Sequence, residues 1–209
     1  MAQAKPSDKL IWLQIFGINK NKAYSLSSAE DLTNFGFFQR STVREHLRFA
    51  SRTSAERCPT TKRISISLKE VPFTCHVYNN ENNLCGIAIT NNKYSTRVAH
   101  SLINKMLSQF WGKYGKKVNI KTLNKDNEFE TDYLQPLITA YQNPNEADKL
   151  LKIQKNLDDI KDIMHKNIED VLNRGETLDG LLDKSKDIGE VSKMFHKKAR
   201  KTNQCCTWY

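Results

Sequence analysis

Two adjacent cysteines near the end of the chain carry the most distinctive chemistry in the sequence. Cys206 is the fourth residue from the end, where a prenyl acceptor stands, and Cys205 directly precedes it. A basic cluster with no acidic residue after Glu190 comes before them: Lys193, Lys197, Lys198, Arg200 and Lys201. One lipid holds a protein to a bilayer only marginally, so stable attachment takes two signals. We expect prenylation of Cys206, a palmitoyl or other second lipid on Cys205, and an anionic membrane surface as a partner.

A second feature is one arginine inside a long apolar repeat. Alternating steps of three and four residues from Leu150 trace a mostly apolar seam, which is typical of a coiled coil. Its apolar members are Leu150, Ile153, Leu157, Ile160, Met164, Val171, Leu178, Leu181, Ile188 and Phe195. Arg174 is the only charged member, and further apolar residues widen the face beyond what two helices need. A buried guanidinium demands acceptors from partner helices, whereas a local stutter or a snorkelling side chain is the simpler alternative.

Glycines interrupt the predicted coiled-coil segment over 147–204, which is called the tail below. Gly175, Gly180 and Gly189 each cost about 1 kcal/mol relative to alanine within a helix. A lone helix with its apolar stripe in water has nothing to offset that cost. We therefore expect the tail to fold only with partner helices, or by docking on the N-terminal domain.

The preceding part of the chain alternates between strand and helix patterns. Strands are expected over 10–18, 23–26, 64–68, 73–78 and 84–90. Helices are expected over 42–56, 98–110 and 134–141, the first opened by a capping box between Thr42 and Glu45. The order predicts an α+β fold, in which helices flank a five-stranded antiparallel sheet.

Phe49 stands out on the first of these helices. It lies roughly 100° away from the apolar stripe of Val43, Leu47 and Ala50, so we expect an exposed aromatic ring. An isolated surface phenylalanine needs no explanation. We expect instead an autoinhibitory surface, at which Phe49 receives seam residues of a folded-back tail.

Composition limits the remaining function classes. No apolar run approaches the ~20 residues that span a bilayer, and an odd set of 5 cysteines without an export signal favours the cytosol. The net charge of +10 suits nucleic acid or anionic lipid, but no nucleic-acid motif is present. Cys75, His76 and Cys85 lack a second metal-ligand pair, and phosphate-binding and nucleophile motifs are absent. We expect no enzyme activity, cofactor, metal or nucleic-acid partner.

Two segments are distinctive as whole stretches: Asp31-Leu32-Thr33-Asn34-Phe35-Gly36-Phe37-Phe38-Gln39-Arg40-Ser41-Thr42-Val43 and Val171-Leu172-Asn173-Arg174-Gly175-Glu176-Thr177-Leu178-Asp179. Both are similar to the corresponding segments of prenylated longin R-SNAREs of the Ykt-six type, within the synaptobrevin superfamily. The resemblance implies a longin (profilin-like) domain that contacts its own SNARE helix. It implies three Q-SNARE partner helices, each supplying a glutamine to the layer of Arg174. It also implies a v-SNARE acting in membrane fusion between ER and Golgi and at Golgi, endosomal and vacuolar membranes, cycling through the cytosol.

The expected organisation has four parts. They are a longin domain over 1–141, a linker over 142–146, an R-SNARE coiled-coil motif over 147–204 and a lipidated tail over 205–209. Trp208 and Tyr209 depart from the family's aliphatic ending, so the choice between farnesyl and geranylgeranyl stays open. The identity of the Q-SNARE partners, the dominant membrane and the resting conformation also stay open. The alternative function is a longin-type coiled-coil tether or adaptor without fusion activity.

Overall fold

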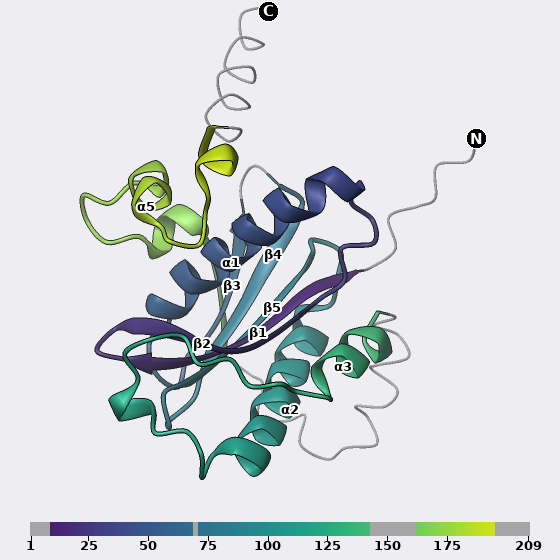
Figure 1. Cartoon of the computed structure of the whole chain (residues 1–209), viewed down its shortest axis with the longest axis vertical. Helices are drawn as coiled ribbons and strands as arrows, with labels where there is room; N and C mark the ends of the chain where they lie inside the picture. The colour runs from purple at the N-terminus through teal and green to yellow at the C-terminus, as the bar shows by residue number, and fades with distance from the viewer. Residues whose placement is uncertain (1–8, 69–70, 143–161, 195–209) are drawn as a thin grey trace, which may run out of the picture.

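A computed structural model of the chain describes residues 9–68, 71–142 and 162–194 (Figure 1). Its strands are β1 (Leu10–Asn19), β2 (Lys22–Glu30), β3 (Arg63–Leu68), β4 (Phe73–Asn79), β5 (Leu84–Asn91) and β6 (Ile163–Asn167). Its α-helices are α1 (Arg40–Glu56), α2 (Thr96–Tyr114), α3 (Leu134–Ala140) and α5 (Leu178–Lys184). Short 3-10 turns are η1 (Phe37–Gln39), η2 (Ile120–Thr122) and η3 (Ile168–Val171).

The strands form one sheet in the order β2-β1-β5-β4-β3-β6. All neighbouring pairs are antiparallel except β3 and β6. The predicted α+β architecture is confirmed, with one difference: the sheet has 6 strands rather than five. The extra strand comes from the tail, where the sequence predicts only helix.

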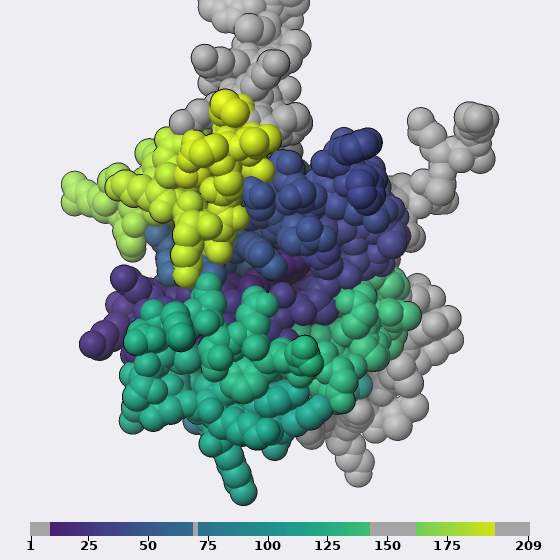
Figure 2. Space-filling view, viewed as in Figure 1, coloured from purple at the N-terminus to yellow at the C-terminus, as the bar shows by residue number. Residues whose placement is uncertain are grey.

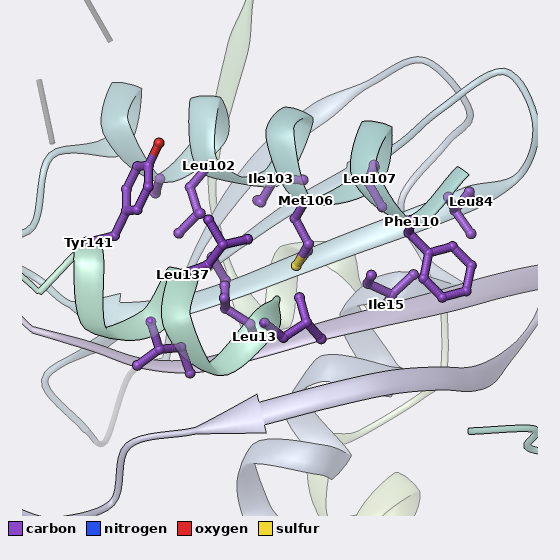
Figure 3. Packing of buried hydrophobic residues seen from close by; sticks show 14 of the residues in the cluster. Leu13, Ile15, Leu84, Leu102, Ile103, Met106, Leu107, Phe110, Leu137 and Tyr141 are labelled. Carbon is purple, nitrogen blue, oxygen red and sulfur yellow. The ribbon is translucent and has the colours of Figure 1, made fainter. Parts of the chain in front are cut away.

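Helices cover both faces of the sheet, α1 on one and α2 with α3 on the other (Figure 1). Beneath α2, strand side chains such as Leu13 and Ile15 pack against Ile103, Met106 and Phe110 (Figure 3). A Cβ atom on Gly86 would lie 2.6 Å from Ile103 Cγ2, so this strand needs glycine for α2 to approach so closely.

The face beneath α1 has a separate core. There, Trp12 and Phe16 of β1 and Ile64 and Ile66 of β3 are buried with Leu47 of α1. Because both faces of β1 are covered, its almost unbroken apolar run becomes the centre of the molecule.

The predicted start of the first helix is wrong. Helix α1 begins at Arg40, two residues before Thr42, and its N-cap residue makes no side-chain capping bond. Since Thr42 is already inside the helix, its carbonyl oxygen faces Nδ1 of His46 at 2.8 Å. Glu45 is therefore not used for capping, and its carboxylate instead reaches the tail.

Cys75, His76 and Cys85 belong to the packed interior. Both cysteines are buried free thiols, and burial raises the pKa of Cys75 to about 12. His76 Nδ1 lies 2.9 Å from Ser65 Oγ, and its Nε2 lies 3.0 Å from Thr90 Oγ1. Burial lowers the pKa of His76 to about 3, so the ring is neutral at physiological pH. In the part of the chain that the structure describes, no group of three or more metal-ligating side chains comes together.

No helix within 9–68, 71–142 or 162–194 is both long enough and apolar enough to cross a bilayer.

Candidate functional site

The tail lies across α1, on the face of the sheet opposite α2 (Figures 1 and 2). Over residues 162–194 it runs as β6, η3, a turn, α5, a loop and a further helical stretch at 190–194. The continuous helix expected over 147–204 is therefore absent from the described part of this segment. The physical reason is that the domain supplies backbone and apolar partners that a lone helix would lack.

Strand β6 extends the sheet by pairing in parallel with β3, with Arg63 opposite Ile163 and Ser67 opposite Asn167. This is strand addition at an open sheet edge, in which main-chain hydrogen bonds replace those of a helix. Directly after β6, Ile168 and Val171 are buried at 3% and 8% exposure against the core under α1. The strand therefore places the next turn of the tail against the domain.

Phe49 is buried rather than exposed, because the tail covers it. Its side chain is only 7% exposed and clusters with Leu182 and Ile188, which are 2% and 4% exposed. Leu178 and Leu181 pack at the margin of this cluster. The exposed ring was predicted from the position of Phe49 on its own helix. The tail residues that cover the ring are distant in sequence, so that helix alone does not predict them.

Arg52 joins the tail to the domain by charge. Its Nε lies 2.5 Å from Asp187 Oδ2 in the tail, and its Nη2 lies 3.1 Å from Asp126 Oδ2 in the loop before α3. The guanidinium also donates to the Ala23 carbonyl and lies 5.4 Å from the Phe16 ring centroid. Burial alone would lower the pKa of Arg52, but the two carboxylates outweigh it and raise the pKa. The Arg52 and Asp187 side chains are 13% and 9% exposed, which shields this pair from solvent.

Two further polar contacts flank this ion pair. Glu45 Oε2 accepts a hydrogen bond from the Gly189 N–H at 2.8 Å. Burial would raise the pKa of Glu45, but this bond and another from Ser192 lower it. At the other end of α1, Arg57 Nη2 lies 2.9 Å from Glu176 Oε2. The tail is thus held at three places along one helix.

Arg174 lies exposed in a turn between η3 and α5. Gly175 beside it has φ +85°, in the left-handed region that favours glycine. The turn is closed by Glu176, whose carboxylate accepts the Asn173 N–H at 2.9 Å. The guanidinium proposed for a bundle core therefore faces water in this conformation.

The structure brings together only part of the predicted seam. Val171 and Ile188 are buried, Met164, Leu178 and Leu181 are half-buried, and all five contact the domain. The remaining predicted members and the cysteine pair lie outside the described residues: Leu150, Ile153, Leu157, Ile160, Phe195, Cys205 and Cys206.

Arg52, Asp126 and Asp187 are functional residues that the sequence did not predict. Arg52 lies four residues after Arg48 on a helix that carries several arginines, so its type and spacing were not distinctive. Its tail partner is 135 residues away, and no local pattern connects the two.

A helix-flanked sheet of this order, followed by an apolar seam with one arginine, defines a longin-domain protein with a SNARE motif. Family models agree: the Regulated-SNARE-like (Longin) domain matches residues 32–133, and Synaptobrevin matches residues 149–209. The VAMP-like protein YKT61 of Arabidopsis thaliana is 43% identical over 87% of this chain and 89% of its own length. The Synaptobrevin homolog YKT6 of Saccharomyces cerevisiae is 37% identical, and that of Debaryomyces hansenii 40%, each over 95% of this chain and 98% of its own.

The chain belongs to the YKT6 family of synaptobrevin homologues. It is an R-SNARE of vesicle trafficking.

Proposed function

We propose that this R-SNARE rests in a closed state, in which its N-terminal domain withholds its own SNARE motif from assembly. Release of the tail then lets Arg174 enter a four-helix bundle with three Q-SNARE helices, and the bundle drives membrane fusion. The observation that carries the proposal is the burial of Phe49 by Leu182 and Ile188.

The closed state and the bundle need different backbones for the same residues. Residues of β6 are extended, at about 3.3 Å per residue, whereas an α-helix advances 1.5 Å per residue. Met164 and Val171 contact the domain in the closed state, although the sequence assigns both to the bundle seam. A chain with β6 paired to β3 therefore has no helical seam to offer at these positions.

Release has an energetic cost that partners must offset. Burial of an apolar side chain contributes about 1.5–3 kcal/mol, so exposing Phe49, Leu182 and Ile188 costs on the order of 5 kcal/mol. The Arg52–Asp187 pair adds to this cost. These contacts therefore favour the closed state when partners are absent, and partner helices can overcome them by mass action.

Membrane attachment completes the proposed function. We assign a prenyl group to Cys206 and a second, reversible lipid to Cys205, supported by the basic residues between Lys193 and Lys201. Such a protein would attach peripherally at the cytosolic face of Golgi, endosomal or vacuolar membranes and return to the cytosol. In this proposal residues 1–141 form the longin domain, 142–146 the linker, 147–204 the SNARE motif and 205–209 the lipidated tail.

Thermal melting of the reconstituted four-helix bundle tests the central role of Arg174. Arg174→Ala would leave three partner glutamine carbonyls without their donor, at about 1–3 kcal/mol for each unsatisfied group. We expect a lower melting temperature of the bundle and unchanged melting of the N-terminal domain. Lys184→Ala removes an exposed charge outside the seam and serves as the matched control. Equal melting of the two variant bundles would contradict the central-layer role.

The alternative is a tether that uses the same coil without fusing membranes. It is favoured if wild-type protein binds partner helices but does not mix lipids between vesicles. A charged seam residue supports the fusion role, because a simple tether has no use for a buried arginine that lowers stability.

A further inference from the structure

Phe37 and Phe38 form the most exposed apolar pair in the described part of the molecule. Their side chains are 78% and 92% exposed. The two rings lie edge to face, with centroids 5.5 Å apart, and project from the 3-10 turn η1. Such rings are unfavourable in water, which points to a surface that meets another apolar phase.

The turn that presents these rings is held in place. Arg40 Nε donates to the Phe35 carbonyl at 3.1 Å, and the Gly36 N–H donates to Gln39 Oε1 at 3.3 Å. The Phe35 ring faces inward, with its centroid 6.2 Å from that of Phe73. None of these contacts involves the tail, so the pair is presented in both the closed and the released state.

The described chain leaves the domain near this turn. Gly189 is bonded to Glu45, within the second turn of α1, and η1 leads directly into the first. The start of α1 and residues 190–194 lie on the same side of the molecule (Figure 1). Val191 and Met194 on that stretch are also exposed, at 73% and 64%.

The 15 residues after Met194 carry Lys197, Lys198, Arg200, Lys201 and the cysteine pair. This segment follows residues 190–194, which lie on the same side of the molecule as the start of α1 (Figure 1).

We propose that Phe37 and Phe38 form a bilayer-inserting tip, which docks the longin domain on the membrane that its tail attaches to. The orientation rests on the proposed attachment through the tail, whereas the insertion itself does not. Amphipathic aromatic contacts of this kind bury rings at the boundary between headgroups and acyl chains.

The local charges explain why the insertion is apolar in character. Arg44 is paired with Glu30, while Lys9 and Arg40 lie near Asp31, so these five side chains carry a net charge of only +1. Attraction to anionic lipid therefore comes mainly from the basic residues after Glu190, and the tip adds a contribution that depends little on lipid charge. The apolar tip is small, because two rings of about 150–250 Å² each compare with about 800 Å² per partner in stable protein interfaces.

The test is sedimentation of full-length, unlipidated protein with vesicles. One set is pure phosphatidylcholine and the other is phosphatidylcholine with phosphatidylserine at about 7:3. We expect the double substitution Phe37→Ser with Phe38→Ser to lower the partition coefficient about tenfold on both vesicle sets, at low and at high salt. Trp111→Ser removes a 40% exposed ring from α2, on the opposite layer, and should leave partitioning unchanged.

Equal partitioning of the double variant and the wild type would overturn the inference, as would a loss confined to anionic vesicles at low salt. Failure of the wild type to bind either vesicle would also overturn it. The double variant should assemble with partner helices as the wild type does. If assembly is lost while vesicle binding persists, the rings contact protein instead and the inference is wrong. Because no lipid anchor is present, these outcomes are independent of the proposed lipidation.

Discussion

Phe49 and Arg52 hold the tail on the domain by two kinds of contact: Phe49 by apolar burial and Arg52 by ion pairing. Phe49 supplies non-directional burial, which tolerates small shifts of α5. Arg52 adds direction, since its two carboxylate partners come from different segments, Asp126 before α3 and Asp187 in the tail. Removal of Asp187 would leave Arg52 with Asp126 as its remaining carboxylate partner.

Phe49→Glu should open the closed state. A carboxylate placed against Leu182 and Ile188 would be buried without a partner. The free-energy cost of burying this charge exceeds the stabilisation that apolar burial gives the cluster. We expect the amides of residues 178–189 to lose protection in hydrogen exchange, while those of α2 keep theirs. Phe38→Glu introduces the same charge at a site 92% exposed and is the matched control. Unchanged protection of 178–189 in Phe49→Glu would contradict the autoinhibitory role.

Glu45 should make its contact with the tail pH-dependent. Its pKa is lowered in the folded protein, so the contact stabilises the closed state fully above the ordinary glutamate value of about 4.3. That stabilisation is lost as pH falls through the lower folded pKa. We expect the Gly189 amide proton shift to titrate below pH 4.3 in NMR spectra. Glu45→Gln should abolish the titration, and its persistence in that variant would assign it to another group.

At the scale of elements, the proposed function requires two incompatible structures of the stretch from β6 to α5. In the closed state it is a strand, a 3-10 turn and a short helix, interrupted where Gly175 adopts φ +85°. The bundle requires one helix through the same residues. Gly175 therefore favours the closed state in two ways. It permits the turn after η3, and it weakens the continuous helix that the bundle requires.

Gly175→Ala should shift this balance toward assembly. A left-handed alanine costs about 1–2 kcal/mol, and alanine favours the helix by about 1 kcal/mol. Together these change the ratio of released to closed chain by about 30- to 150-fold. The measurement is the rate of bundle formation with partner helices, which should rise.

Gly112→Ala is the matched control, because Gly112 is helical in α2 and a Cβ there would meet nothing within 4 Å. An unchanged assembly rate for Gly175→Ala would mean that the turn does not limit release.

The whole molecule combines a folded domain, a segment to which we assign two conformations, and a stretch of basic residues followed by the cysteine pair. For the last of these we expect Cys206→Ser to leave the protein in the cytosolic fraction. Cys205→Ser should leave it weakly bound and salt-sensitive, because one lipid is then helped only by basic residues at about 1 kcal/mol each. Cell fractionation with mass spectrometry of the C-terminal peptide measures both effects. An unmodified Cys206 on membrane-bound protein would refute the anchor.

Local pattern determined most of the domain. Each element is buried against its neighbours in a way that its own sequence pattern predicts. The patterns are the apolar run of β1, the alternation in β3 and the helical spacing from Val98 to Phe110. The turn at Lys20 and Asn21, with φ 49° and 60°, is likewise a local property of a tight hairpin. The seam around Arg174 and the cysteine pair with its basic residues were also predicted from residue types and their spacing alone. These features sufficed to predict the fold class, whereas the family was indicated by the resemblance of residues 31–43 and 171–179 to prenylated longin R-SNAREs.

Only the tertiary structure decided the state of the tail. Its sequence has the period of a helix, yet Ile163–Asn167 is a strand, because the free edge of β3 offers main-chain partners along its length. Phe49 is buried only because Leu182 and Ile188 fold back over it, and Arg52 meets Asp187 across 135 residues. A periodic pattern records which side chains seek burial but not which surface will bury them. That choice depends on the competition between the domain and partner helices for the same apolar face.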